Sequence, residues 1–203
     1  MTTLILTEPL IENYTDLAAT IQAGHKRIAL ANNLADGGST VSKGVMAEAV
    51  RYAHDHQVTL DLLIAPRGGK PVYNDVELKI MEADLLEAQQ LGVDGVILGA
   101  LTTDNALDVE GLQLIIAAAG GMTLTFSTAY DAIAPEHREA ALNWLAEQGF
   151  DYLLSHDDEA GLLATHQLVQ KAGLILIPAS LTATETQSVT TKLGLNLVFN
   201  SQI

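Results

Sequence analysis

Several polar side chains of this 203-residue chain directly follow predicted buried strands, where they could bind a ligand. Arg67 stands between Pro66 and the pair Gly68-Gly69 in the loop after one apolar run. A guanidinium at that place could bind an anion, helped by glycine amides that approach it closely. The same arginine could instead hold its own loop by pairing with a structural carboxylate such as Glu8. The sequence leaves both interpretations open.

Two carboxylates and a histidine are expected at the same edge. Glu8 follows the first predicted strand and could serve as a general base, bind a metal, or form an ion pair with Arg67 or Arg27. Asp131, after a later strand, has the same interpretations. His156 is the only histidine expected on this rim. Because a histidine without a placed partner is weak support for catalysis, no catalytic residue is assigned.

The candidate binding residues share a position after the carboxyl end of a predicted strand. They are Glu8, Asn32, Arg67, Thr102, Ser127, Asp131 and His156. The pairs Gly37-Gly38 and Gly68-Gly69 could each present backbone amides to an oxyanion, although tight turns alone explain most such pairs. The expected ligand is a small anion, and the residues alone assign no metal site.

Bringing these residues together requires parallel strands whose carboxyl ends meet. Eight apolar runs are interpreted as strands: Leu4–Leu6, Arg27–Ala31, Val58–Ile64, Asp94–Leu98, Met122–Phe126, Phe150–Leu154, Leu174–Ile177 and Leu195–Phe199. Seven helical segments separate them: Asn13–Ala23, Lys43–His56, Val76–Gly92, Asp108–Ala119, Pro135–Gln148, Gly161–Lys171 and Thr182–Leu193. Pro9, which cannot donate to a ladder, is expected to end the first strand.

This alternation predicts an α/β fold, a single-domain (β/α)8 TIM-type barrel over residues 1–203. The spacing of about 25 residues per unit suits the small end of that class. An open doubly wound sheet is the main alternative, and it usually has fewer strands. We favour the barrel because the last strand can close on the first. Little chain follows that strand, so a partner subunit in a homodimer could cover the closure.

Composition excludes several functions. The formal charge of −15 opposes binding to nucleic-acid phosphates and to anionic membrane surfaces. The absence of cysteine excludes disulfides, thiolate zinc sites and a cysteine nucleophile. No basic segment precedes Leu4–Leu6, and no apolar run reaches membrane-spanning length. A cytoplasmic location is therefore expected.

Five segments resemble the CutC family, whose proteins are named for copper homeostasis. They are ENYTD (Glu12–Asp16), RIALANNLADGGSTVSKGVM (Arg27–Met46), PRGGKPVYNDVELKIMEAD (Pro66–Asp84), GVDGVILGALTTDN (Gly92–Asn105) and TFSTAYD (Thr125–Asp131). The resemblance covers nearly the whole chain, is specific through Asn105 and weakens after Asp131. It implies a (β/α)8-type barrel and a role in handling copper, with a mechanism that the family name does not settle.

The departures from the family pattern lie at one rim. Ala29 and Ala31 stand where the family has Glu and Cys, and Leu10 stands where it has another Cys. Ala65 takes the place of an arginine, and Ser127 takes the place of a histidine. Charged and donor groups are thus lost together while the framework is kept. Erosion or replacement of an ancestral site would produce this pattern.

Copper is implied only by this resemblance. Cu(I) prefers thiolate and thioether ligands. The chain has no cysteine, and its methionines (Met1, Met46, Met81 and Met122) form no M-x-M cluster, so tight thiolate binding is excluded. Three hypotheses follow: a copper homeostasis protein without a thiolate site, an enzyme or binding protein for a small anionic metabolite, and a non-catalytic oligomeric scaffold with an eroded site. The sequence does not decide whether the chain is an enzyme.

Overall fold

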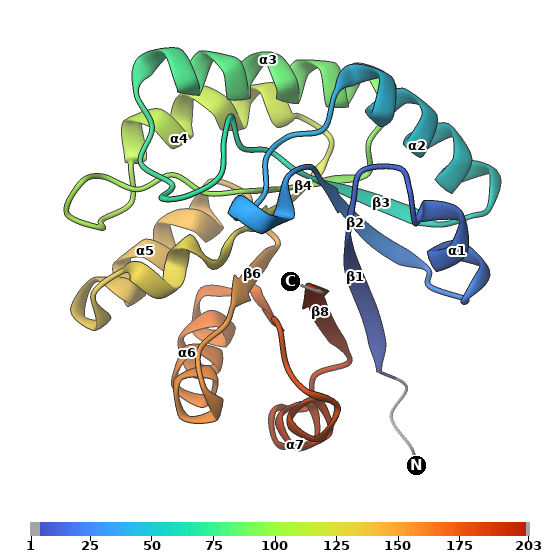
Figure 1. The fold of residues 1–203 in the computed structure, drawn as a ribbon. Coiled ribbons are helices and arrows are strands. Elements are labelled where there is room, and N and C mark those ends of the chain that lie inside the picture. Colours follow the sequence, from blue (N-terminus) through green and yellow to red (C-terminus); the bar gives the residue numbers. More distant parts are fainter. Residues whose placement is uncertain (1–4, 202–203) are drawn as a thin grey trace.

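The computed structural model describes residues 5–201, which form a barrel of eight parallel strands with helices outside it (Figure 1). The strands are β1 (Leu6–Glu12), β2 (Arg27–Ala31), β3 (Thr59–Leu63), β4 (Gly95–Leu98), β5 (Thr123–Phe126), β6 (Tyr152–Ser155), β7 (Ile175–Pro178) and β8 (Leu197–Ser201). The helices are α1 (Leu17–Gln22), α2 (Lys43–Asp55), α3 (Asp75–Leu91), α4 (Val109–Ile116), α5 (Pro135–Glu147), α6 (Glu159–Ala172) and α7 (Ala183–Leu193). Short 3-10 helices are η1 (Leu34–Asp36), η2 (Ala117–Ala119) and η3 (Thr128–Ala132). The predicted TIM-type barrel is confirmed.

The barrel closes through its last strand, as the sequence predicts. The strand order is β7-β6-β5-β4-β3-β2-β1-β8, and β8 pairs with β1 along all five of its residues. The seam between β7 and β8 has fewer paired residues than the pairing of β8 with β1. Within residues 5–201 it includes one parallel bridge, Ala179 with Phe199, and a 3.0 Å hydrogen bond from the Ser180 amide to the Phe199 carbonyl. The alternative of an open doubly wound sheet is wrong.

The first strand is longer than predicted. Of the predicted segment Leu4–Leu6, Leu4 lies outside the described residues, and β1 runs on through Pro9. The expectation that Pro9 ends the strand is wrong. Pairing with β2 begins at Leu10, directly after the proline, so the missing N–H falls before that ladder starts. Because β1 takes the chain to its twelfth residue, the predicted helix Asn13–Ala23 shortens to the six residues of α1.

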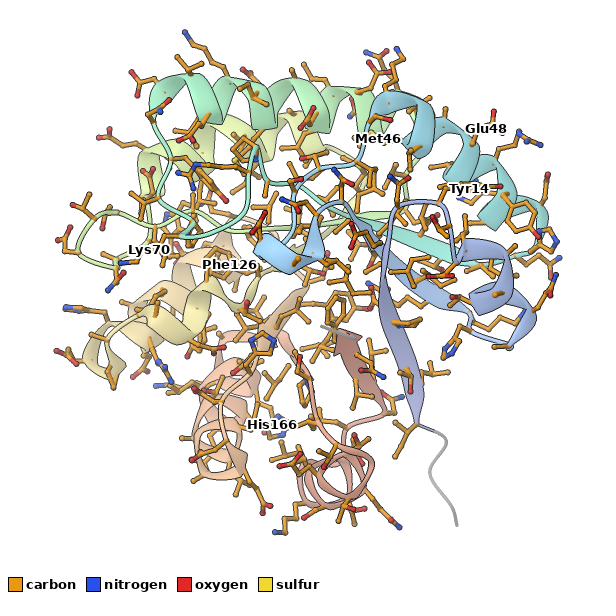
Figure 2. All side chains as sticks on the ribbon, in the orientation of Figure 1. Tyr14, Met46, Glu48, Lys70, Phe126 and His166 are labelled. Carbon is orange, nitrogen blue, oxygen red and sulfur yellow. The ribbon has the colours of Figure 1, made fainter. Side chains whose placement is uncertain are left out.

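Two apolar layers hold the barrel together. The outer layer lies between strands and helices and includes Met46 and Phe126 (Figure 2). The inner layer fills the barrel: its members are Leu10, Ala29, Leu63, Tyr152, Ile97, Leu154, Ile177, Ala179, Leu197 and Phe199. Side chains two residues apart on a strand face the same side, so these positions identify the inward face of each strand. The barrel is therefore filled, and any site lies at one of its ends. Within residues 5–201, no helix has the length and apolar character needed to cross a membrane.

Candidate functional site

A hollow of about 260 Å³ lies at the carboxyl ends of β3, β4 and β5, where TIM-type barrels place their sites. We call it the mouth hollow. Its lining is Gly37, Gly38, Leu63, Ile64, Ala65, Arg67, Gly69, Pro71, Tyr73, Gly99, Ser127, Thr128, Ala129 and Ala132. Of the seven candidate binding residues, Arg67 and Ser127 belong to this lining. The structure therefore brings together two of the predicted residues and places the other five elsewhere.

Arg67 is engaged within its own loop. Its Nε donates to Glu77 Oε1 at 2.6 Å, and its NH2 group donates to Glu77 Oε2. Its NH1 group donates to the Gly68 and Lys70 carbonyls, and NH2 also donates to the Val72 carbonyl at 2.8 Å. These bonds use all five guanidinium N–H groups. The structural carboxylate is thus Glu77 and not Glu8, and no N–H of Arg67 is left for an anion.

The Arg67 partner also caps the following helix. The Asn74 side chain accepts from the Val76 and Glu77 amides, and Glu77 accepts from the Asn74 amide at 2.9 Å, which forms a capping box at the start of α3. The hydrogen bond from Arg67 lowers the pKa of Glu77, and the Asn74 amide adds to this effect. The loop after β3 and the start of α3 therefore form one rigid wall of the mouth hollow.

Three of the glycine amides near the hollow already donate hydrogen bonds within the protein. Gly37 donates to the Leu34 carbonyl, Gly38 to the Asn33 carbonyl and Gly69 to the Asp36 carbonyl, each at 2.9–3.1 Å. An oxyanion that bound one of these three amides would have to displace its hydrogen bond. These amides are therefore poorer donors for an anion than the Gly-Gly pairs suggest.

Ser127 and Gly99 shape the floor of the hollow. The Ser127 hydroxyl accepts from the Ala129 amide at 3.3 Å and so begins η3. A Cβ added to Gly99 would lie 2.3 Å from the Ser127 oxygen. Glycine is required at that position because any side chain would displace the serine from the hollow.

Asp131 and His156 meet beside the hollow but do not line it. The Asp131 carboxylate accepts from the Ser155 hydroxyl at 2.7 Å and from the His156 amide at 2.8 Å. Burial raises the pKa of Asp131, and these two hydrogen bonds partly offset the rise. Arg138 donates to the Asp131 carbonyl and to the Asp157 carboxylate, both at 2.9 Å. This network holds the loop after β6 in place, while the His156 side chain is exposed.

Asn32 and Thr102 lie on loops after β2 and β4. The Asn32 backbone pairs with Ser39 in both directions, at 2.8 and 2.7 Å. The Thr102 hydroxyl accepts from the Ala106 amide at 3.1 Å and closes a turn. Both residues shape rim loops, and their role in binding stays a prediction.

Glu8 is not at the rim. It is the third of the seven residues of β1, and its Oε2 accepts from Arg27 Nε at 2.7 Å. The expected ion pair with Arg27 is confirmed, whereas the expected rim position is wrong because β1 continues past Glu8. Leu10 and Ala29, two residues further along the same inward faces, belong to the inner apolar layer. That layer separates Glu8 from the mouth.

The sequence interpretation missed Asp61, which also binds Arg27. Its side chain is buried at the centre of β3, whose other residues are Thr and Leu. The sequence offered one signal, a single charged residue within an apolar strand. Charged groups are seldom buried without a partner, so this aspartate indicated a buried ion pair.

No group of three or more His, Cys, Asp or Glu side chains within residues 5–201 is placed to hold a metal ion. The sulfur atoms of Met46, Met81 and Met122 are packed in the outer apolar layer. Met1 lies outside the described residues. The thioethers that the structure describes are thus held between strands and helices, away from the mouth.

The fold and the mouth hollow define a small TIM-type barrel with a filled interior. Residues 5–203 match the model of the CutC family. A CutC family protein of Enterococcus faecalis is 49% identical over 150 residues, covering 74% of this chain and 72% of that protein. The crystal structure of a CutC protein from Streptococcus agalactiae is 33% identical, covers 97% of this chain and 98% of its own, and superposes with a TM-score of 0.90. This chain belongs to the CutC family.

A human relative is named copper homeostasis protein cutC homolog. It is 33% identical over 150 residues, which cover 74% of this chain and 53% of the human protein. The match therefore spans about half the length of the human relative.

Proposed function

We propose that this chain takes part in copper homeostasis without holding copper through cysteine. The observation that carries the proposal is membership of the CutC family over residues 5–203, together with the copper role named for the human relative. The chemistry of the side chains supports the second half. Cu(I) is bound most tightly by thiolates and thioethers, and the chain has no cysteine, while three of its four methionines are packed in the core.

The two other hypotheses find less support in the geometry. A small anion would need donors, yet Arg67 and the amides of Gly37, Gly38 and Gly69 are engaged within the protein. A scaffold agrees with the filled barrel, but it does not account for the mouth hollow, whose floor is formed by Gly99 and Ser127.

Total cellular copper tests this proposal. A bacterial strain lacking its own CutC protein is grown in copper-supplemented medium with this chain or with an empty vector, and copper per cell is measured by mass spectrometry. We expect the chain to restore the parental copper content. An unchanged copper content at an expression level confirmed by immunoblot would contradict the proposal. Fractionation of the same strain and light scattering on the purified protein test the proposed cytoplasmic location and homodimer.

A further inference from the structure

Three charged side chains from adjacent strands meet inside the amino-terminal half of the barrel. Arg27 on β2 donates through Nε to Glu8 on β1 and through NH2 to Asp61 on β3. The side chains of Glu8 and Asp61 are 2% and 1% exposed, and that of Arg27 is 18% exposed. We call these residues the Glu8–Arg27–Asp61 cluster. Its two acids are buried as deeply as the apolar core.

The cluster has one acid too many for its single base. If both carboxyl groups were ionised, two negative charges would face one positive charge, leaving a net charge of −1 in an apolar interior. Burying an uncompensated charge is costly, and the group normally changes its protonation state instead.

The unsatisfied oxygens point to the same conclusion. Glu8 Oε1 and Asp61 Oδ1 are buried and have no donor within residues 5–201. Gly95 of β4 lies beside this oxygen, and a Cβ added there would lie 2.5 Å from Asp61 Oδ1. The Arg27 guanidinium binds one oxygen of each carboxyl group, Glu8 Oε2 and Asp61 Oδ2, and leaves the other oxygen of each without a donor. Two ionised carboxylates could not satisfy each other, because neither carries a hydrogen to donate. A proton between them supplies the missing donor.

We propose that the barrel holds one bound proton, shared between the carboxyl groups of Glu8 and Asp61. This proton completes the hydrogen bonds by which the Glu8–Arg27–Asp61 cluster joins β1 to β2 and β3. With it, the cluster is neutral: Asp61 donates an O–H hydrogen bond to Glu8, and Arg27 binds both side chains. No residue of the mouth hollow takes part.

The charged surroundings favour the proton on Asp61. Burial is the main cause that raises its pKa well above the ordinary value, and the Glu8 charge raises it further, while Arg27 lowers it. Asp94, just before β4, adds a weaker repulsion and is itself paired with His54 at 3.1 Å.

Other groups near the cluster act on Arg27. The ring of Tyr152 on β6 lies 5.0 Å from the Arg27 guanidinium carbon. Burial would lower the pKa of Arg27, but Asp61 and Glu8 outweigh it and raise that pKa, so Arg27 stays charged. Asp61 is therefore the group of the cluster that loses its proton as pH rises.

The Glu8–Arg27–Asp61 cluster lies beside β8, the strand that closes the barrel. Glu8 is in register with Phe199 of β8, and Phe199 forms a bridge to Ala179, which directly follows β7. Losing the proton would leave two carboxylates repelling each other beneath this thin seam. We therefore expect β8 and the seam to open more readily at alkaline pH.

The sign of the pH dependence follows from the raised pKa of Asp61. Between the unfolded pKa of about 3.9 and the higher folded pKa, the folded chain binds more protons than the unfolded chain. The stability from this proton is complete below the unfolded value and is lost as pH rises through the folded value. Across that window the unfolding equilibrium constant rises by up to about tenfold per pH unit.

Carboxyl-carbon NMR on the wild-type protein detects the proton directly. The Asp61 signal, identified by its loss in Asp61→Asn, is expected in the protonated position at pH 5 and to move as pH rises. Thermal unfolding between pH 5 and 8 gives a second readout. As pH rises from 5 to 8, we expect the wild type to lose stability relative to the Asp61→Asn protein. The Glu8→Gln protein keeps one acid for Arg27, and we expect it to lack this dependence on pH.

The exposed Asp55→Asn serves as the matched control and should keep the wild-type dependence. The contribution of the His54–Asp94 pair is common to all four proteins and cancels in the comparison. Should Asp61→Asn fail to fold, Glu8→Gln and the wild-type NMR titration decide the matter. An Asp61 signal that stays in the ionised position from pH 5 to 8, or a Glu8→Gln protein that follows wild type, would overturn the proposal.

Discussion

Replacing Arg27 with methionine is expected to destabilise the fold by about 3–5 kcal/mol, the usual cost of breaking a buried ion pair from one side. Methionine keeps most of the apolar stem, so the loss comes mainly from charge. Glu8 and Asp61 would stay buried, 2% and 1% exposed, without the donors that now satisfy them.

Urea unfolding at pH 7 measures this loss. The exposed Arg51, which pairs with Glu48 on the surface of α2, provides the matched Arg51→Met control, for which we expect little change. Acidification should partly rescue the Arg27→Met protein, because protonating both acids removes their buried charges. Equal urea midpoints for Arg27→Met and Arg51→Met would show that the cluster contributes little to stability.

Replacing Phe126 with alanine is expected to cost about 3–5 kcal/mol, because the surrounding side chains cannot fill the space that the ring leaves. Phe126, labelled in Figure 2, ends β5 and is fully buried. It packs edge-on against Phe150, with ring centroids 5.8 Å apart. It directly precedes Ser127, so the cavity would also loosen the floor of the mouth hollow.

Thermal and urea unfolding of Phe126→Ala and Phe126→Leu separate the cavity from the loss of the aromatic contact. The leucine variant keeps most of the volume and should lose clearly less than the alanine variant. A loss below about 1 kcal/mol for Phe126→Ala, the typical size for an average substitution, would mean that neighbouring side chains collapse into the site.

Most of the fold could be predicted because each unit is built from local signals. Apolar runs locate β2 to β7, and Gly92 and Gly173 end α3 and α6 in the left-handed conformation. Pairing across the closure is not local. Pro9 argues against a strand by itself, yet β8 pairs beside it and β2 pairs just beyond it, so the long-range partners outweigh the local signal.

The site was harder to predict because it depends on which residues face each other. Arg67 could be placed on the rim from its loop, but its partner Glu77 lies ten residues later, on the next helix. Asp61 lies 34 residues from Arg27, and only the register of β2 against β3 brings them together. Sequence spacing carries no information about such a register when the strands are separated by helices.

A competition titration with Cu(I) tests most directly whether this chain lacks a tight Cu(I) site. The purified, tag-free protein is titrated under anaerobic, reducing conditions against a chromophoric chelator that holds free Cu(I) in the nanomolar range. We predict that the chelator keeps the copper, because no cysteine is present and the described methionine sulfurs are packed in the core. The prediction would be contradicted if one equivalent of Cu(I) passed from the chelator to the protein and the control variant His54→Gln still bound it tightly.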